Sequence, residues 1–250
     1  MRAAHQRGFT LLEIMIAMAI GLFIALALVT IVNTNKAAFL SQNQLEQMQD
    51  SERMAMTLMA DVIQAAGYFP DPTTNTLGAT LVAGGAFVNS QSITGQYTAA
   101  APGDSISVRY MTAPQDGILN CSGTSNTNAV GGANILYVNQ FAVVAGVPSG
   151  QLVCTVTIAG NSTAYTLVNG VTNLSVMYGV KTNAAALGNN VDTYMNATQV
   201  TAGGYWQNII SVQIKLTFLN PLYTAAGQGQ VQFITLQRIV DVMNQTGPNT

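Results

Sequence analysis

The carboxylate of Glu13 has the most unusual chemical setting in this sequence. It is the only ionisable side chain in the apolar run from Phe9 to Val32. An acid in a membrane-spanning helix costs on the order of 2.5–3.5 kcal/mol at the bilayer centre, so a nearby cation is expected to offset it. A cut between Gly8 and Phe9 would supply one, because the new α-amine would lie four residues before Glu13 on the same helix face.

Two other interpretations of the apolar run were weighed. It is long enough to cross a bilayer as a plain signal anchor, but an anchor leaves Glu13 unexplained. Ala25-Leu26-Ala27 offers the small-x-small pattern of a secretory signal peptide, yet the run continues to Val32 and exceeds the usual apolar region of such peptides. In each case Arg2 and Arg7 predict a cytoplasmic N-terminus and an exported remainder.

Few other side chains offer chemistry. The sole histidine, His5, precedes the expected cut, so histidine-based acid–base or nucleophilic catalysis is not expected. Cys121 and Cys154 lack further ligands for a metal, and an even count in an exported region fits one disulfide. Asp50, Glu52 and Asp61 are expected on solvated helix positions. We therefore predict no enzyme, no catalytic residue, no metal and no cofactor.

The charge balance argues against nucleic acid as a partner. Charged residues make up 7% of the chain, and its formal net charge is −2. Loss of residues 1–8 would remove two arginines and make the balance more acidic. A nucleic-acid site requires clustered Lys and Arg, and the sequence contains no such cluster.

A long helix is predicted to position Glu13 and the apolar run. Between Asn33 and Ala66 there is no proline or glycine, and apolar residues recur at three- and four-residue steps. Gly67 is a plausible C-cap, and Pro70 and Pro72 prevent continuation. We predict a helix from about Phe9 to Ala66, divided into a membrane half (9–32) and a periplasmic half (33–67).

The remaining residues, 68–250, are predicted to form one β-rich domain. Apolar and polar residues alternate with period two, which is typical of half-buried antiparallel strands. The alternating runs are 105–110, 152–158, 173–180 and 210–218. The fold class is therefore α+β, with the apolar stripe of the helix covering one face of the sheet.

The hexapeptide Gly8 to Glu13 resembles the class III signal of type IV pilins and pseudopilins. The resemblance implies that a prepilin peptidase cuts between Gly8 and Phe9 and N-methylates Phe9, removing a leader of residues 1–8. It also implies that Glu13 pairs with the N-terminus of a neighbouring subunit during assembly.

Short motifs along the β region resemble the PilW-type minor pilins. They are Ala65 to Phe69, Asp104 to Tyr110, Cys121 to Gly123, Leu152 to Cys154, Val171 to Gly179, Tyr194 and Trp206. The resemblance supports the Cys121–Cys154 bridge and a pilin-like fold. The family pattern would place acids after Gly179, whereas this chain has Lys181-Thr182-Asn183, so no calcium site is expected there.

The function implied is that of a minor pilin in initiation or assembly of the type IV pilus. Expected partners are other minor pilins, the major pilin, the prepilin peptidase, the inner membrane and a PilY-type tip adhesin. The domain is expected in the periplasm and, after assembly, in the pilus. The alternatives are a J-type pseudopilin of a type II secretion system and a tip adhesin, whose exposed aromatic patch would be formed by Tyr194, Tyr205 and Trp206.

Overall fold

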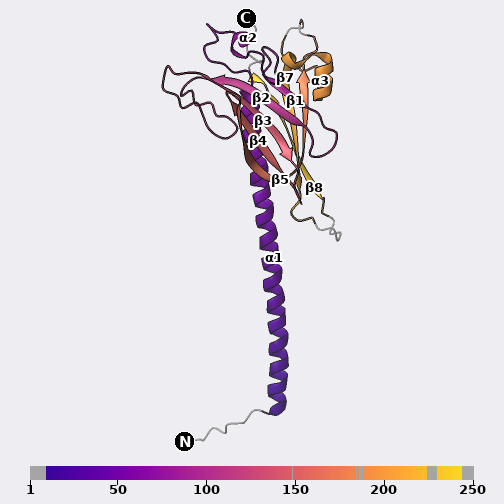
Figure 1. The fold of residues 1–250 in the computed structure, drawn as a ribbon. Coiled ribbons are helices and arrows are strands. Elements are labelled where there is room, and N and C mark those ends of the chain that lie inside the picture. Colours follow the sequence, from indigo (N-terminus) through magenta and orange to yellow (C-terminus); the bar gives the residue numbers. More distant parts are fainter. Residues whose placement is uncertain (1–9, 148, 184, 186–187, 224–229, 244–250) are drawn as a thin grey trace. The chain divides into compact units, whose positions relative to one another are not determined.

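The computed structural model describes residues 10–147, 149–183, 185, 188–223 and 230–243. The chain divides into two compact units, one up to Gln47 and one from Met48 onward. The first unit is the N-terminal part of helix α1 (Leu11–Gln64). The second contains the last turns of α1 and a single antiparallel sheet (Figure 1). This is the α+β architecture that the sequence predicts.

Helix α1 begins and ends close to its expected limits. It is continuous over 54 residues, as expected for a segment without internal proline. Its end is a turn in which Gly67 takes a positive φ of 77°. The N–H of Gly67 then donates to the carbonyl of Arg109, at 3.0 Å, and this bond leads the chain from the helix to the sheet.

The sheet is a near-continuous meander. The strands follow the order β1-β2-β3-β4-β5-β7-β8, with β6 paired to β5, and every pair is antiparallel. The bounds are β1 (Ile93–Gln96), β2 (Ser105–Thr112), β3 (Ile135–Val144), β4 (Gly150–Ile158), β5 (Asn161–Val180), β6 (Thr193–Met195), β7 (Ile209–Leu219) and β8 (Phe233–Asp241). The short elements are α2 (Leu77–Thr80), α3 (Ala197–Gly203) and η1 (Trp206–Asn208).

The core lies between one face of the sheet and the last turns of α1. Alternate residues of β7, including Val212, Ile214 and Leu216, are fully buried. From the helix, Ala55, Met59 and Ile63 join the same apolar cluster. The helix stripe therefore covers the sheet as expected. Met56 and Met59 serve as packing residues, whereas Met54 is exposed.

Four of the described strands (β1, β3, β6 and β8) and the three short helices were not predicted. β3 and β8 alternate less regularly than β7, and β5 extends well before residue 173. Helix α3 begins with a capping box in which Asn196 and Gln199 bond reciprocally, each at 2.9 Å. The part of β5 before residue 173 pairs with β4 as a hairpin. Such a hairpin needs little apolar alternation, because the backbone N–H and C=O groups of each strand bond those of the other.

Candidate functional site

The N-terminal end of α1 is a capping box formed by Thr10 and Glu13. The Thr10 hydroxyl accepts the N–H of Glu13 at 3.3 Å. In return, Oε2 of Glu13 accepts the N–H and the hydroxyl of Thr10, at 3.1 and 3.2 Å. This arrangement satisfies helix N–H groups that would otherwise lack partners and places a negative charge at the positive end of the helix dipole.

This role of Glu13 was readable in the sequence but was missed. Thr10-Leu11-Leu12-Glu13 has the Ser/Thr-x-x-Glu spacing that marks a capping box. The structure places Glu13 in the first turn of α1, which begins at Leu11. Gly8 and Phe9, the expected processing site, lie outside the described residues. Within the described chain only Oε2 of Glu13 is hydrogen-bonded, and Oε1 has no bond.

The segment that follows Glu13 is long and apolar enough to cross a membrane. Every side chain from Thr10 to Leu40 is exposed in the chain by itself, including Phe23 and Leu22. A contiguous apolar surface of this length indicates a non-aqueous environment or a partner.

The hydroxyls of this segment are satisfied within the helix. Thr30 donates to the Leu26 carbonyl at 2.9 Å, and Thr34 donates to the Thr30 carbonyl at 2.8 Å. Ser41 repeats the pattern with Ala37 at 3.0 Å. Internal partners of this kind are what a lipid environment requires, since the bilayer core offers no water to bond polar groups.

The sheet domain contains the expected disulfide. Cys121 and Cys154 are bonded, and both are fully buried. The N–H of Cys121 also donates to Oδ1 of Asn139 on β3, at 2.9 Å. Together these bonds attach the irregular segment after β2 to the centre of the sheet, across a sequence separation of 33 residues.

Glu52 corrects one sequence expectation. It was placed on a solvated helix position, but it lies on the sheet side of α1 and is only 5% exposed. Its Oε1 is buried and has no hydrogen-bond partner in the described structure. Burial raises the pKa of this carboxyl above its ordinary value.

Arg109 departs from the alternation predicted for 105–110. In that run it falls with the polar positions, yet it is 1% exposed. Its guanidinium donates to four backbone carbonyls and lies 4.6 Å from the centre of the Phe87 ring. The acceptors and distances are Gln91 (2.6 Å), Val82 (2.6 Å), Leu81 (3.0 Å) and Val88 (2.8 Å). The buried arginine thus holds the segment from α2 to β1, and burial lowers its pKa.

The proposed aromatic patch is not a continuous exposed surface. Tyr194, Tyr205 and Trp206 are all half-buried. Trp206 packs edge-on against the buried Tyr178 ring, with centroids 5.0 Å apart, and donates to the Thr201 hydroxyl at 3.0 Å. The tryptophan therefore packs within the domain.

The loop after β5 uses its one acid internally. Oδ2 of Asp192 accepts the N–H and the hydroxyl of Thr182 at 2.8 and 2.9 Å, and the N–H of Asn183 at 3.4 Å. The bonds from Thr182, with that from Asn183, lower the pKa of Asp192. Asp192 therefore closes the loop as an ordinary hydrogen-bond acceptor.

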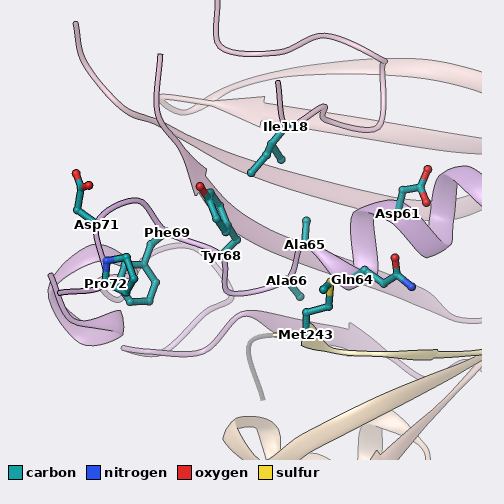
Figure 2. Close-up of a pocket in the computed structure, with 10 residues that line it drawn as sticks. All are labelled: Asp61, Gln64, Ala65, Ala66, Tyr68, Phe69, Asp71, Pro72, Ile118 and Met243. Carbon is teal, nitrogen blue, oxygen red and sulfur yellow. The ribbon is translucent and has the colours of Figure 1, made fainter. Parts of the chain in front are cut away.

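A cavity of about 530 Å³ opens at the C-terminal end of α1 (Figure 2). Asp61 and Gln64 line it from the helix, and the turn that follows contributes Tyr68 and Phe69. Burial, followed by the charges of Asp116 and Asp71, raises the pKa of Tyr68. The described residues that line the cavity include no serine, cysteine or histidine.

Two protein-family models match the chain, one at its N-terminal helix and one over most of its sheet. Residues 136–248 match the family model described as Type IV Pilus-assembly protein W. Residues 3–29 match the model described as Prokaryotic N-terminal methylation motif. No curated protein and no solved structure matches the chain.

Proposed function

We propose that this chain, a PilW-type minor pilin of the type IV pilus, takes part in initiating or assembling the pilus. One observation carries the proposal: an apolar helix begins at the Thr10–Glu13 capping box, directly after the Gly8-Phe9 step of a methylation motif. The family is one of structural pilins, and its members' role is to be incorporated into a fibre, not to catalyse a reaction.

Processing is the first step of the proposal. A prepilin peptidase removes residues 1–8 and N-methylates Phe9, which creates an α-amine one residue before the helix cap. Because Thr10 already binds Oε2 of Glu13, the carboxylate is fixed at the start of the helix. Its unbonded Oε1 is then available to the Phe9 amine of a neighbouring subunit.

The pairing determines how subunits are staggered. An acid and an amine are both costly in lipid when they are unpaired, so the helices associate where the two charges meet. The capping box lowers the cost of Glu13 in the single subunit but leaves half of the carboxylate unsatisfied. The motif and apolar helix fit a membrane-anchored pilin. The proposed location is the inner membrane, with the disulfide-bonded domain in the periplasm and then in the pilus.

The experiment begins with the N-terminal residue and intact mass of the protein from membranes, with and without the prepilin peptidase. A chain beginning at N-methylated Phe9 only when the peptidase is present supports the proposal. A start after Ala27, or an uncut Met1 in both strains, refutes it.

The second part of the experiment compares Glu13→Ala with Glu46→Ala. Glu46 is an exposed acid of the same helix, outside the apolar run, so it controls for loss of charge. Glu13→Ala should be processed normally but incorporated poorly into sheared pili, whereas Glu46→Ala should behave as the parent. Normal incorporation of Glu13→Ala would rule out the role of the charge pair.

A further inference from the structure

The long edge of the sheet is formed by β8. Among the described strands, β8 pairs only with β7, so one side of its backbone has no partner strand. The opposite edge is β1, which is only 4 residues long, whereas β8 has 9. A short strand is one way in which proteins blunt a sheet edge, and β8 lacks that protection.

Two hydrogen bonds that flank β8 establish which of its backbone groups are free of β7. At one end the N–H of Val242 donates to Ile210, and at the other the N–H of Asn220 donates to Gln232, both at 2.9 Å. The register between these bonds is uninterrupted. In an antiparallel ladder, hydrogen-bonded residues alternate with residues whose N–H and C=O point away. The even-numbered residues of β8 therefore bond β7, and those with free N–H and C=O groups are Phe233, Thr235, Gln237, Ile239 and Asp241.

The strand lacks several other devices that prevent edge pairing, although it contains the charged residues Arg238 and Asp241. It contains no proline, glycine or lysine, and its pairing with β7 has no bulge, unlike the pairings of β5 with β4 and with β7. Phe233 and Ile239, on the outer face, are 46% and 51% exposed. A long, regular edge with exposed apolar side chains is suited to pairing with another strand.

We propose that the free edge of β8 binds an extended segment of a neighbouring pilin subunit, which adds a strand to the sheet. This inference rests on the proposed function, because it names a contact within the assembly. The segment would place apolar residues beside Phe233 and Ile239. On the other face it would place a carboxylate opposite Arg238, whose side chain is exposed.

The position of Arg238 favours a different subunit over a second copy of this chain. Two β8 strands pairing antiparallel through their free edges would match odd residues with odd and even with even. Arg238 would then face Ile234, Leu236, Val240 or the other Arg238, and never Asp241. This pairing of two copies places no acid opposite Arg238, whereas a segment of another subunit that carries a carboxylate does, and opposite charges across a ladder stabilise pairing.

The first test is site-specific crosslinking in piliated cells. A photoreactive phenylalanine replaces Gln237 at the edge, Tyr165 on the exposed part of β5, or Phe23 in the apolar helix, each in the full chain. Support requires that Gln237 crosslinks to one extended segment of another pilin, identified by peptide mass, and that Tyr165 does not. Crosslinks from Phe23 to pilin helices report assembly independently.

The outcomes are distinguishable. If Phe23 crosslinks to pilins and Gln237 does not, the strand-addition proposal is overturned while the proposed function stands. If Gln237 crosslinks to a second copy of this chain, or to residues 244–250 of its own chain, the proposal is also overturned. If neither Phe23 nor Gln237 crosslinks to a pilin, both proposals fail.

The second test uses the alternation of free groups. Gln237→Pro removes an N–H that points away from β7, so the ladder with β7 is retained, while the incoming strand loses a donor and meets the proline ring. We expect incorporation into pili to fall at least about fivefold, with normal processing, and Gln237→Ala to match the parent. Parental incorporation of Gln237→Pro would overturn the proposal. The crosslinking result does not depend on the folding of this variant.

Discussion

The buried Arg109 gives the sharpest stability prediction for the sheet domain. Arg109→Ala removes the donors to four carbonyls. Leu81 and Val88 each keep a backbone donor, from Ser90 and Gln91 respectively. The carbonyl of Gln91, in contrast, is left buried without a donor.

The magnitude follows from these partners. An orphaned buried carbonyl costs about 1–3 kcal/mol, and loss of the contact with the Phe87 ring adds about 1 kcal/mol. The variant no longer has to bury a cation, and the free energy saved in this way offsets part of the loss of the other hydrogen bonds. We expect a net loss of about 3 kcal/mol, in the range for breaking a buried charged network.

Urea unfolding of the detergent-solubilised chain measures this loss. Trp206 is the only tryptophan and packs on Tyr178 in the core, so its fluorescence reports unfolding of the domain. With a slope of about 2 kcal/mol per M, the midpoint should fall by about 1.5 M for Arg109→Ala. The midpoint of Arg109→Lys should lie between those of the parent and of Arg109→Ala, because an ammonium group cannot reach all four carbonyls.

The matched control is Arg53→Ala, which removes an exposed arginine from α1. Its midpoint should change by less than about 0.3 M, as for an ordinary surface substitution. Hydrogen exchange should also accelerate for residues 81–91 in Arg109→Ala. A midpoint for Arg109→Ala equal to that of the control would refute the role assigned to the buried guanidinium.

Three other predictions concern the same domain. Because the pKa of Glu52 is raised in the folded chain, the protonated carboxyl favours folding. This contribution to the free energy of unfolding is complete below pH 4.5, and it is lost as the pH rises through the pKa of Glu52 in the folded state. Glu52→Gln should therefore be more stable than the parent at pH 7, by about 1–3 kcal/mol, with the difference shrinking towards pH 4 in urea titrations. Replacing Cys121 and Cys154 by serine should cost about 2–5 kcal/mol, and reductant should lower the midpoint of the parent but not of the variant. Gly95→Ala should cost about 1–3 kcal/mol by thermal unfolding, because the added methyl would meet the Tyr178 hydroxyl and the Ser105 carbonyl. The control Gly84→Ala, at a glycine with open space around it, should change the stability by less than about 0.5 kcal/mol.

The sequence by itself determined the local elements of this protein. The 3.6-residue and two-residue periods depend only on neighbours along the chain, and they located α1 and the most regular strands, β2, β4 and β7. The membrane-length apolar run, the cysteine pair and the Gly8 to Glu13 motif were also visible there. The capping box of Thr10 and Glu13 is a local pattern as well, and it was open to the same reasoning.

Only the tertiary structure decided which polar side chains are buried. Glu52 and Arg109 occupy positions that an isolated helix or strand would expose. Their burial depends on the sheet under α1 and on the segment between α2 and β1, which is distant in sequence. Likewise, β8 becomes an edge with free odd-numbered groups only because the meander ends there. Strand order and burial arise from pairing between distant segments, and a local period contains no information about that pairing.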